Sequence, residues 1–357
     1  MIALLRMKRG WDSTRRVASR PFRPANLTME PALQRILVVG GNGFIGSAVC
    51  KAALARGVQV TSISSSGRPY RTLKGHTPAW ANKVDWQKAD ALRPETYAHI
   101  LPNVTAVVHT LGTLLEDGAY KAAVRTGDVV GLVGSITRSF GVGGGKSPLG
   151  SAASSAGSYE TMNRDSALRV CDAFLSATPQ TESSDPKAFV YVSAEDTLRP
   201  WIPARYIETK REAEKEIESM VTIKPNFRAV YIRPSLVYHA HLRPLVSPLA
   251  ALLDLSATVH RKMPSNLPTP SAILRTLAPV LASAQSPSSP SPLESMANAM
   301  TIPPIHVEHV AEAIAIAVDP SRIDIRGVYG VREMRELIGW SEKGQELPTS
   351  GHVNQHV

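Results

Sequence analysis

The stretch ILVVGGNGFIG, residues 36–46, decides the fold, because four apolar residues run directly into a glycine-rich turn. An apolar strand, a turn with this glycine spacing and a following helix are typical of a dinucleotide-binding βαβ unit. Gly40 allows the tight turn, Gly43 lets the backbone approach a pyrophosphate, and Gly46 lets the helix pack closely against the strand. This stretch therefore predicts a dinucleotide site near the amino terminus of an α/β domain.

The helix that follows the turn supplies the other half of this phosphate site. Its first residues, Phe44 and Ile45, present backbone N–H groups and the positive end of the helix dipole to the phosphates. We therefore expect both residues to contact the cofactor.

The rest of the chain continues the same alternation of apolar strands and amphipathic helices. This pattern predicts a doubly wound parallel sheet, a Rossmann fold with helices on both faces, over residues 31–340. The expected strands are residues 36–39, 58–63, 106–109, 188–193, 229–233 and 304–307. The expected helices are residues 44–56, 160–176, 203–220 and 308–318. A small lobe on the substrate side is expected at about residues 235–300.

Three segments lack the apolar residues that a packed element needs. Residues 141–158 are almost entirely Gly, Ser and Ala, and residues 283–295 are rich in Ser and Pro. Both are expected to be flexible insertions, and residues 341–357 a polar tail.

The positive charge of the chain is concentrated at its amino terminus. Residues 1–23 contain seven basic side chains and one acid, so they carry +6 of the total formal charge of +10. An Arg-rich, acid-poor start with short apolar patches is typical of a mitochondrial targeting segment. We therefore expect residues 1–30 to direct the protein to the mitochondrial matrix, or to the matrix face of the inner membrane. The alternative is a basic tail with no targeting role, and nucleic acid is dropped as a partner.

Cysteine, histidine and hydropathy patterns limit the other site types. The two cysteines, Cys50 and Cys171, are expected to be buried thiols, because no zinc-like spacing of Cys and His occurs. His306 and His309 are expected to serve capping and packing, so no metal site is predicted. No apolar run is long enough for a membrane-spanning helix. The apolar runs 245–255 and 272–284 either pack on the domain or contact a lipid tail or membrane surface.

The residues after the second expected strand bear on the choice of cofactor. An NAD site usually places a carboxylate about 20 residues beyond the first glycine, but no Asp or Glu occurs between Glu30 and Asp85. The strand instead runs into Ser64 and, four residues later, Arg68, which suit a 2′-phosphate. The sequence therefore favours NADP(H), with NAD(H) as the alternative. Asp90 is placed either to meet the adenine or to cap a helix.

A second group of polar residues lies further along the chain. Tyr206 and Lys210 are spaced i, i+4, so a helix places the phenol and the ammonium on one face. A cation beside a phenol lowers its pKa and suits proton transfer to a substrate oxygen. Ser193 ends an apolar strand 13 residues upstream, at the sheet edge where such folds bind ligands.

With these motifs in order, the chain resembles the extended and atypical branch of the short-chain dehydrogenase/reductase superfamily, which is similar to NAD-dependent epimerases and dehydratases. The resemblance covers about residues 35–320. Beyond the glycine turn and the Ser/Tyr/Lys set, it rests on four further landmarks in the family's order: Val107–Gly112, Tyr159–Asn163, Ile232–Tyr238 and Ile305–Ala311.

Shorter stretches resemble a narrower group within this branch. They are Gly112–Glu116, Ala119–Lys121, Asn163–Ala167 and Trp201–Pro203 together with Tyr206–Glu214. This group is the fungal mitochondrial one associated with the coenzyme Q (ubiquinone) biosynthesis complex, and it is similar to the dehydrogenase-like accessory subunit of respiratory complex I.

The resemblance implies particular roles for the residues named. Tyr206 would be the general acid/base, Lys210 would contact the nicotinamide ribose and the phenol, and Ser193 would orient the substrate oxygen. The glycine turn and Gly112 would line the cofactor.

Two functions follow from the resemblance. One is an NADP(H)-dependent oxidoreductase of ubiquinone biosynthesis, acting on a carbonyl, a hydroxyl or an isoprenoid quinone intermediate. The other is a non-catalytic subunit that holds a dinucleotide and serves assembly of a mitochondrial quinone-synthesis or respiratory complex.

Overall fold

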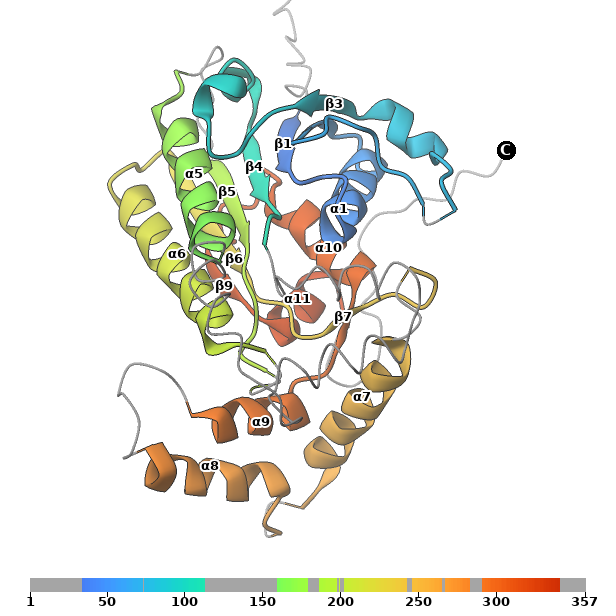
Figure 1. Ribbon diagram of the computed structural model, residues 1–357, viewed down its shortest axis with the longest axis vertical. Coiled ribbons are helices and arrows are strands. Elements are labelled where there is room, and N and C mark those ends of the chain that lie inside the picture. Colours follow the sequence, from blue (N-terminus) through green and yellow to red (C-terminus); the bar gives the residue numbers. More distant parts are fainter. Residues whose placement is uncertain are drawn as a thin grey trace, which may run out of the picture. The chain divides into compact units, whose positions relative to one another are not determined.

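A single parallel sheet forms the centre of the computed structural model, which describes residues 34–72, 74–112, 159–178, 186–197, 199, 202–242, 246–264, 267–282 and 291–340. Seven strands pair in the order β3-β2-β1-β4-β5-β6-β9, and every pairing is parallel (Figure 1). The strands are β1 (Arg35–Val39), β2 (Gln59–Ser64), β3 (Asp85–Lys88), β4 (Ala106–His109), β5 (Lys187–Val192), β6 (Phe227–Ile232) and β9 (Gly327–Tyr329). The order reverses between β1 and β4, which is where doubly wound sheets bind ligands.

Helices cover both faces of this sheet. Because successive strand residues point to opposite sides, Ile36 and Val38 pack on one face, and Leu37 and Val39 pack on the other. The first face is covered by α1 (Phe44–Ala55), α10 (Val307–Ala317) and α11 (Val331–Leu337). The second is covered by α5 (Ser166–Ser176) and α6 (Ala204–Thr222). The predicted α/β architecture is therefore confirmed.

A small lobe lies beyond the sheet and consists of α7 (Ser247–Lys262), α8 (Pro270–Ala282) and α9 (Pro292–Thr301) (Figure 1). Both α7 and α8 pack on α9. Helix α9 is joined to the segment after β5, because the Asn298 Nδ2 atom donates to the backbone oxygen of Asp196 at 3.2 Å. None of the helices in the described part of the chain is long and apolar enough to cross a bilayer.

Two sequence predictions need correction in this region. The Ser/Pro-rich segment 283–295 was expected to be flexible, but its last residues form the start of α9, where the Ser291 side chain accepts a hydrogen bond from the Leu293 N–H. Serine and proline at these positions are helix-start signals, not breakers. The expected strand 304–307 is also shorter: β8 (Ile305–His306) pairs only with β7 (Val237–Tyr238), outside the main sheet.

The predictions for residues 1–30, 141–158 and 341–357 lie outside the described residues. Cys50 and Cys171 are free and buried, as predicted, and burial raises the pKa of the Cys50 thiol to about 12. His306 caps α10 by accepting from the Glu308 N–H at 3.3 Å, so its predicted capping role is confirmed.

A fully buried arginine on β6 binds the segment that connects α10 to β9. Arg228, on β6, is 1% exposed. Its guanidinium donates to three backbone oxygens, those of Ile325, Ala317 and Asp319, at 2.8 to 2.9 Å. The orphan carbonyls at the end of α10 and the turn before β9 are thereby satisfied by one cation.

Candidate active site

The turn after β1 has the close backbone packing that its glycines predict. Gly40 has φ +87°, a left-handed conformation, and a Cβ there would lie 2.7 Å from the Leu111 side chain. A Cβ on Gly46 would overlap the carbonyl oxygen of Gly40. Gly43 forms the N-cap of α1 without a side-chain cap, and the first turn of α1, from Phe44 and Ile45 onward, contains no acid. The turn therefore fits a phosphate, which needs close backbone approach and no opposing carboxylate.

The segment after β2 lies beside this turn. The Asn42 Nδ2 atom is 3.4 Å from the Ser64 Oγ and 3.3 Å from the Ser66 Oγ. The Arg68 N–H donates to the Ser66 Oγ at 3.3 Å, and the Arg68 side chain is exposed. The structure thus brings the Ser64 hydroxyl to the glycine turn through Asn42, while the contact of the Arg68 guanidinium with a phosphate stays a prediction. Asn42 was not among the predicted site residues, although it lies inside the glycine motif.

Asp90 serves the local turn after β3. Its Oδ1 atom accepts from the Leu92 N–H at 3.0 Å, and its carboxylate lies 3.6 Å from Arg93. The predicted helix cap is therefore wrong, because Asp90 holds the turn and the helix that follows, Pro94–Thr96, has no side-chain cap. The adenine contact stays a prediction.

Lys210 lies at the carboxyl ends of β4 and β5. Its ammonium donates to the backbone oxygens of Leu111, at 3.1 Å, and Val192, at 2.9 Å. It also lies next to Gly112, where a Cβ would be 2.9 Å from the Nζ atom. Burial lowers the pKa of Lys210 to about 7, against the opposing effect of Glu214. The lysine is thus buried at the edge where the nicotinamide half of a dinucleotide would lie.

Tyr206 lies one helical turn before Lys210 on α6. Its ring meets the Tyr159 ring edge to face, with centroids 6.3 Å apart. Burial, followed by the neighbouring Tyr159, raises the pKa of the Tyr206 phenol to about 12. The predicted lowering of this pKa by a neighbouring cation is therefore wrong, because burial outweighs the opposing effect of the Arg211 cation. Within the described part of the chain, no hydrogen bond joins the Tyr206 hydroxyl to Lys210 or Ser193. The predicted proximity on one helix is present, but a bonded triad is not.

Ser193 belongs to a cluster of charged side chains. Its hydroxyl accepts from Arg211 at 3.3 Å, and Arg211 pairs with Glu214 at 2.7 Å. The Arg233 guanidinium, which follows β6, also binds Glu214. Burial disfavours the Glu214 carboxylate, but the two arginines hold its pKa below its usual range. The sequence analysis did not find this cluster, because its members come from three separate segments.

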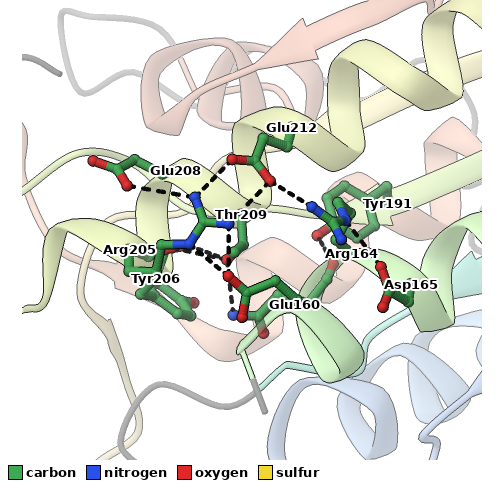
Figure 2. Close-up of polar contacts among 10 residues, drawn as sticks. Glu160, Arg164, Asp165, Tyr191, Arg205, Tyr206, Glu208, Thr209 and Glu212 are labelled. Atoms are coloured by element: carbon green, nitrogen blue, oxygen red, sulfur yellow. Dashed lines mark hydrogen bonds and ion pairs between the residues drawn. The ribbon is translucent and has the colours of Figure 1, made fainter. Parts of the chain in front are cut away.

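A π-helix, Glu160–Asp165, positions α6 from the other side. Figure 2 shows Arg205 of α6 between Glu160 and Glu212, with N–O distances of 2.6 and 2.7 Å. Arg164 reaches the same Glu212 at 2.9 Å. These ion pairs fix the start of α6, and therefore Tyr206, against the π-helix. Such irregular turns are frequent at functional sites.

Buried polar groups connect the π-helix to the sheet. The Tyr191 hydroxyl donates to the backbone oxygen of Asn163 at 2.5 Å. His109, at the end of β4, lies 3.1 Å from the Ser166 hydroxyl, and burial lowers the pKa of its imidazole to about 3. A neutral His109 is therefore a packing and positioning residue beside the site.

A cavity of about 900 Å³ lies between the carboxyl edge of the sheet and the lobe. Glu195, two residues after Ser193, lines it, together with residues of α7, α8 and α11. Burial raises the pKa of Glu195. Ser193, Tyr206 and Lys210 are not among the residues that line it. The cavity adjoins the Ser193 cluster through Glu195, whose carboxyl group lies within the electrostatic influence of Arg211 and Arg233.

Comparisons with known proteins agree with the fold. A sequence model of the NAD dependent epimerase/dehydratase family matches residues 36–125, the part that holds the glycine turn, and indicates nicotinamide dinucleotide binding. MIOREX complex component 2 of Saccharomyces cerevisiae is 35% identical over 58% of this chain and 74% of its own length. The 2-alkyl-3-oxoalkanoate reductase of Stenotrophomonas maltophilia is 30% identical over 30% of this chain and 31% of its own.

Solved structures show the same architecture. A short-chain dehydrogenase/reductase from Mycobacterium ulcerans aligns with 85% of this chain and 90% of its own, with a TM-score of 0.50 and 14% identity. One from Serratia marcescens aligns with 84% and 98%, with a TM-score of 0.50 and 13% identity. At these identities the likeness concerns the fold.

Proposed function

Since the chain belongs to the short-chain dehydrogenase/reductase superfamily, in one family with yeast MIOREX complex component 2, we propose that it is an NADP(H)-dependent oxidoreductase. The observation that carries the proposal is the place of Lys210. Its ammonium is buried at the carboxyl ends of β4 and β5, beside Gly112, with Tyr206 one turn away on the same helix.

The nicotinamide would supply hydride, and the chain's own residues would bind, orient and move a proton. Gly40, Gly43 and Gly46 would hold the pyrophosphate, and Lys210 would donate to the ribose hydroxyls in place of one of its present carbonyl partners. Ser193 would orient the substrate oxygen from the sheet edge.

The Tyr206 hydroxyl would transfer the proton. Because its pKa is raised to about 12, the phenol is protonated near neutral pH and carries the proton that reduction of a carbonyl or quinone oxygen consumes.

We further propose an isoprenoid quinone intermediate as the substrate and mitochondria as the location. The cavity of about 900 Å³ beside Glu195 has room for a ring and part of a tail. The Arg-rich residues 1–23 support mitochondrial import. The yeast relative, MIOREX complex component 2, is a component of a complex, which supports membership in a larger assembly.

A second candidate is a subunit that keeps the dinucleotide as a structural ligand. The observation in its favour is the Ser193 hydroxyl, which is held by Arg211 in the Glu214 cluster. Substrate would have to displace this contact before Ser193 could act.

One substitution separates the two functions. Tyr206→Phe keeps the ring volume, so the protein should fold and bind dinucleotide. An oxidoreductase should nonetheless lose activity by about 10²-fold or more, the usual contribution of a positioned acid. Cellular quinone should then fall toward the level of a deletion strain.

A second variant tests the alternative, in which the dinucleotide is only a structural ligand. Gly43→Asp places bulk and negative charge in the phosphate site, so it should fail to restore quinone under either function. Full restoration by Tyr206→Phe together with failure of Gly43→Asp would overturn the enzyme proposal and support the structural one.

The location has its own test. A reporter fused to residues 1–30 should enter mitochondria, and replacing Arg15, Arg16 and Arg20 with Glu should prevent entry. A cytosolic reporter in the unmutated fusion would refute the targeting prediction.

A further inference from the structure

Helix α7 in the lobe has its small and large apolar residues on unexpected sides. Its buried residues are two alanines, Ala250 and Ala257. Three of its four leucines face solvent instead, with Leu252 62% exposed and Leu255 60% exposed. A helix that only packed on the domain would bury its largest apolar side chains.

The exposed apolar residues of α7 form one stripe. Leu249, Leu252, Leu255 and Val259 fall within roughly one third of the helix circumference at about 100° per residue, and each is at least 44% exposed. The opposite side of α7 lines the cavity through Asp254 and Ala257. The stripe therefore faces away from the protein interior.

Helix α8, the next helix along the chain, also exposes apolar residues on its side away from the cavity, which Ser271 and Arg275 line. Ile273 and Leu277, one turn apart, are 48% and 45% exposed. Within the described residues, seven of the eleven exposed large hydrophobic side chains fall in residues 249–277. We call the six on the two helices the aliphatic face, which consists of Leu249, Leu252, Leu255, Val259, Ile273 and Leu277.

We propose that the aliphatic face docks on the surface of a lipid bilayer that contains anionic lipids. The charges around the face complement such a surface. Lys262, exposed at the end of α7, lies beside the stripe, whereas Arg261 lines the cavity on the opposite side of the helix. Asp254, the one acid on the two helices, lies on the cavity side of α7. Basic ends beside an aliphatic stripe are typical of helices that lie in a membrane interface.

The residue types in the aliphatic face favour a bilayer over a protein as the binding partner. Protein interfaces take most of their binding energy from Trp, Tyr and Arg, and Leu and Val are under-represented among their strongest contacts. The aliphatic face contains only Leu, Ile and Val. A bilayer needs no shaped aromatic anchors, because it accepts any apolar side chain that reaches the acyl region.

Vesicle binding tests the inference on the full chain, independently of the dinucleotide site. Phosphatidylcholine vesicles with phosphatidylglycerol should co-sediment the protein, and vesicles of phosphatidylcholine alone should bind it more weakly. The double substitution Leu252→Ser, Leu255→Ser should weaken binding to the mixed vesicles at least about tenfold, since each leucine loses several buried carbons. Lys262→Gln should reduce the difference between the two vesicle types.

Exposed isoleucines elsewhere supply the control. Ile223 and Ile323 are 75% and 51% exposed, and Ile223→Ser, Ile323→Ser should leave vesicle binding unchanged. Thermal unfolding and dinucleotide binding of the leucine variant should match the wild type, which excludes misfolding. Equal vesicle binding by wild type and leucine variant would overturn the inference. A second result would also overturn it: the wild type does not bind vesicles but self-associates in the ultracentrifuge, and the leucine substitutions abolish that self-association.

Discussion

The two ends of the site are built from different interactions. At the glycine turn, a Cβ on Gly46 would overlap the backbone of Gly40, and a Cβ on Gly40 would meet the side chain of Leu111 after β4, so neither position has room for a side chain. At the Ser193 end, charged side chains from α6 and the segment after β6 hold the arrangement, with Glu214 between two arginines. The first end depends on glycines, which have no side chain, and the second end depends on paired charges.

This difference determines which substitutions and which changes of pH or salt each end tolerates. Close backbone packing is disrupted by a single methyl group but is insensitive to pH and salt. A partly buried ion-pair cluster accepts changes of shape more readily but responds to protonation and to loss of one partner. Substitutions at the two ends should therefore differ in the size and the pH dependence of the stability that they remove.

Gly40→Ala should have the largest effect. The added Cβ meets Leu111 at 2.7 Å, and the residue must keep φ +87°. Strain and overpacking together should lower the free energy of unfolding by about 3 kcal/mol, and dinucleotide binding should be lost. Gly57→Ala is the matched control, because Gly57 also has positive φ (+76°) but no atom within 4 Å of its Cβ. Equal losses in the two variants, measured by urea unfolding, would show that packing contributes nothing.

Glu214→Gln should disrupt the charged end by less. Removing the carboxylate leaves Arg211 and Arg233 facing a neutral amide, and partial exposure of both arginines moderates the loss to about 2 kcal/mol. Because the pKa of Glu214 is lowered in the folded protein, the difference from wild type should vanish as acid protonates the carboxylate. Glu312→Gln, in an exposed pair with Arg56, should cost at most about 0.5 kcal/mol. Similar losses for both variants would remove the special role of the cluster.

Lys210 should make stability pH-dependent above neutrality. Its folded-state pKa of about 7 lies below that of the unfolded chain, so the unfolded state binds more protons between the two values. Stability should therefore rise with pH across this window, by about 2 kcal/mol from about pH 7 to 9. The rise should be absent in Lys210→Met. Parallel curves of unfolding free energy against pH for the two proteins would contradict a folded-state pKa of about 7 for Lys210.

Arg68→Ala should have the smallest effect, at the one place where the glycine end uses charge. We expect wild type to prefer NADPH over NADH, and the variant to lose about 1 kcal/mol of that preference, because the exposed Arg68 forms only part of the phosphate contact. Arg71→Ala, three residues along the same exposed loop, is the control. Isothermal titration with both nucleotides measures the difference, and an unchanged preference would count against NADP(H).

The sequence was sufficient for the glycine end, because strand, turn and helix are adjacent in the chain and each glycine has a local steric reason. It also placed β4, β5 and α6 to within about two residues. Tyr206 and Lys210 were predictable as a pair because their spacing is a property of one helix.

The other end could not be predicted in the same way. The Glu214 cluster joins β5, α6 and the segment after β6, so its charges come together only when the sheet has formed. Strand β9 has only three residues, and its middle residue, Val328, is 45% exposed, which gives a weak hydropathy signal. The start of α9 was missed because serine and proline were interpreted as linker residues when they begin the helix.

Arg228 has a consequence for the order in which the newly made chain can fold. Its three carbonyl partners lie 89 to 97 residues further along the chain. Until those residues are available, β6 carries a cation that has no place in the apolar interior. The domain therefore cannot complete its core strand by strand, and the last step must wait for the segment that contains α10 and β9. A chain that ended before residue 327 would keep an open sheet edge at β6, which makes it a substrate for chaperones or proteases instead of a smaller stable protein.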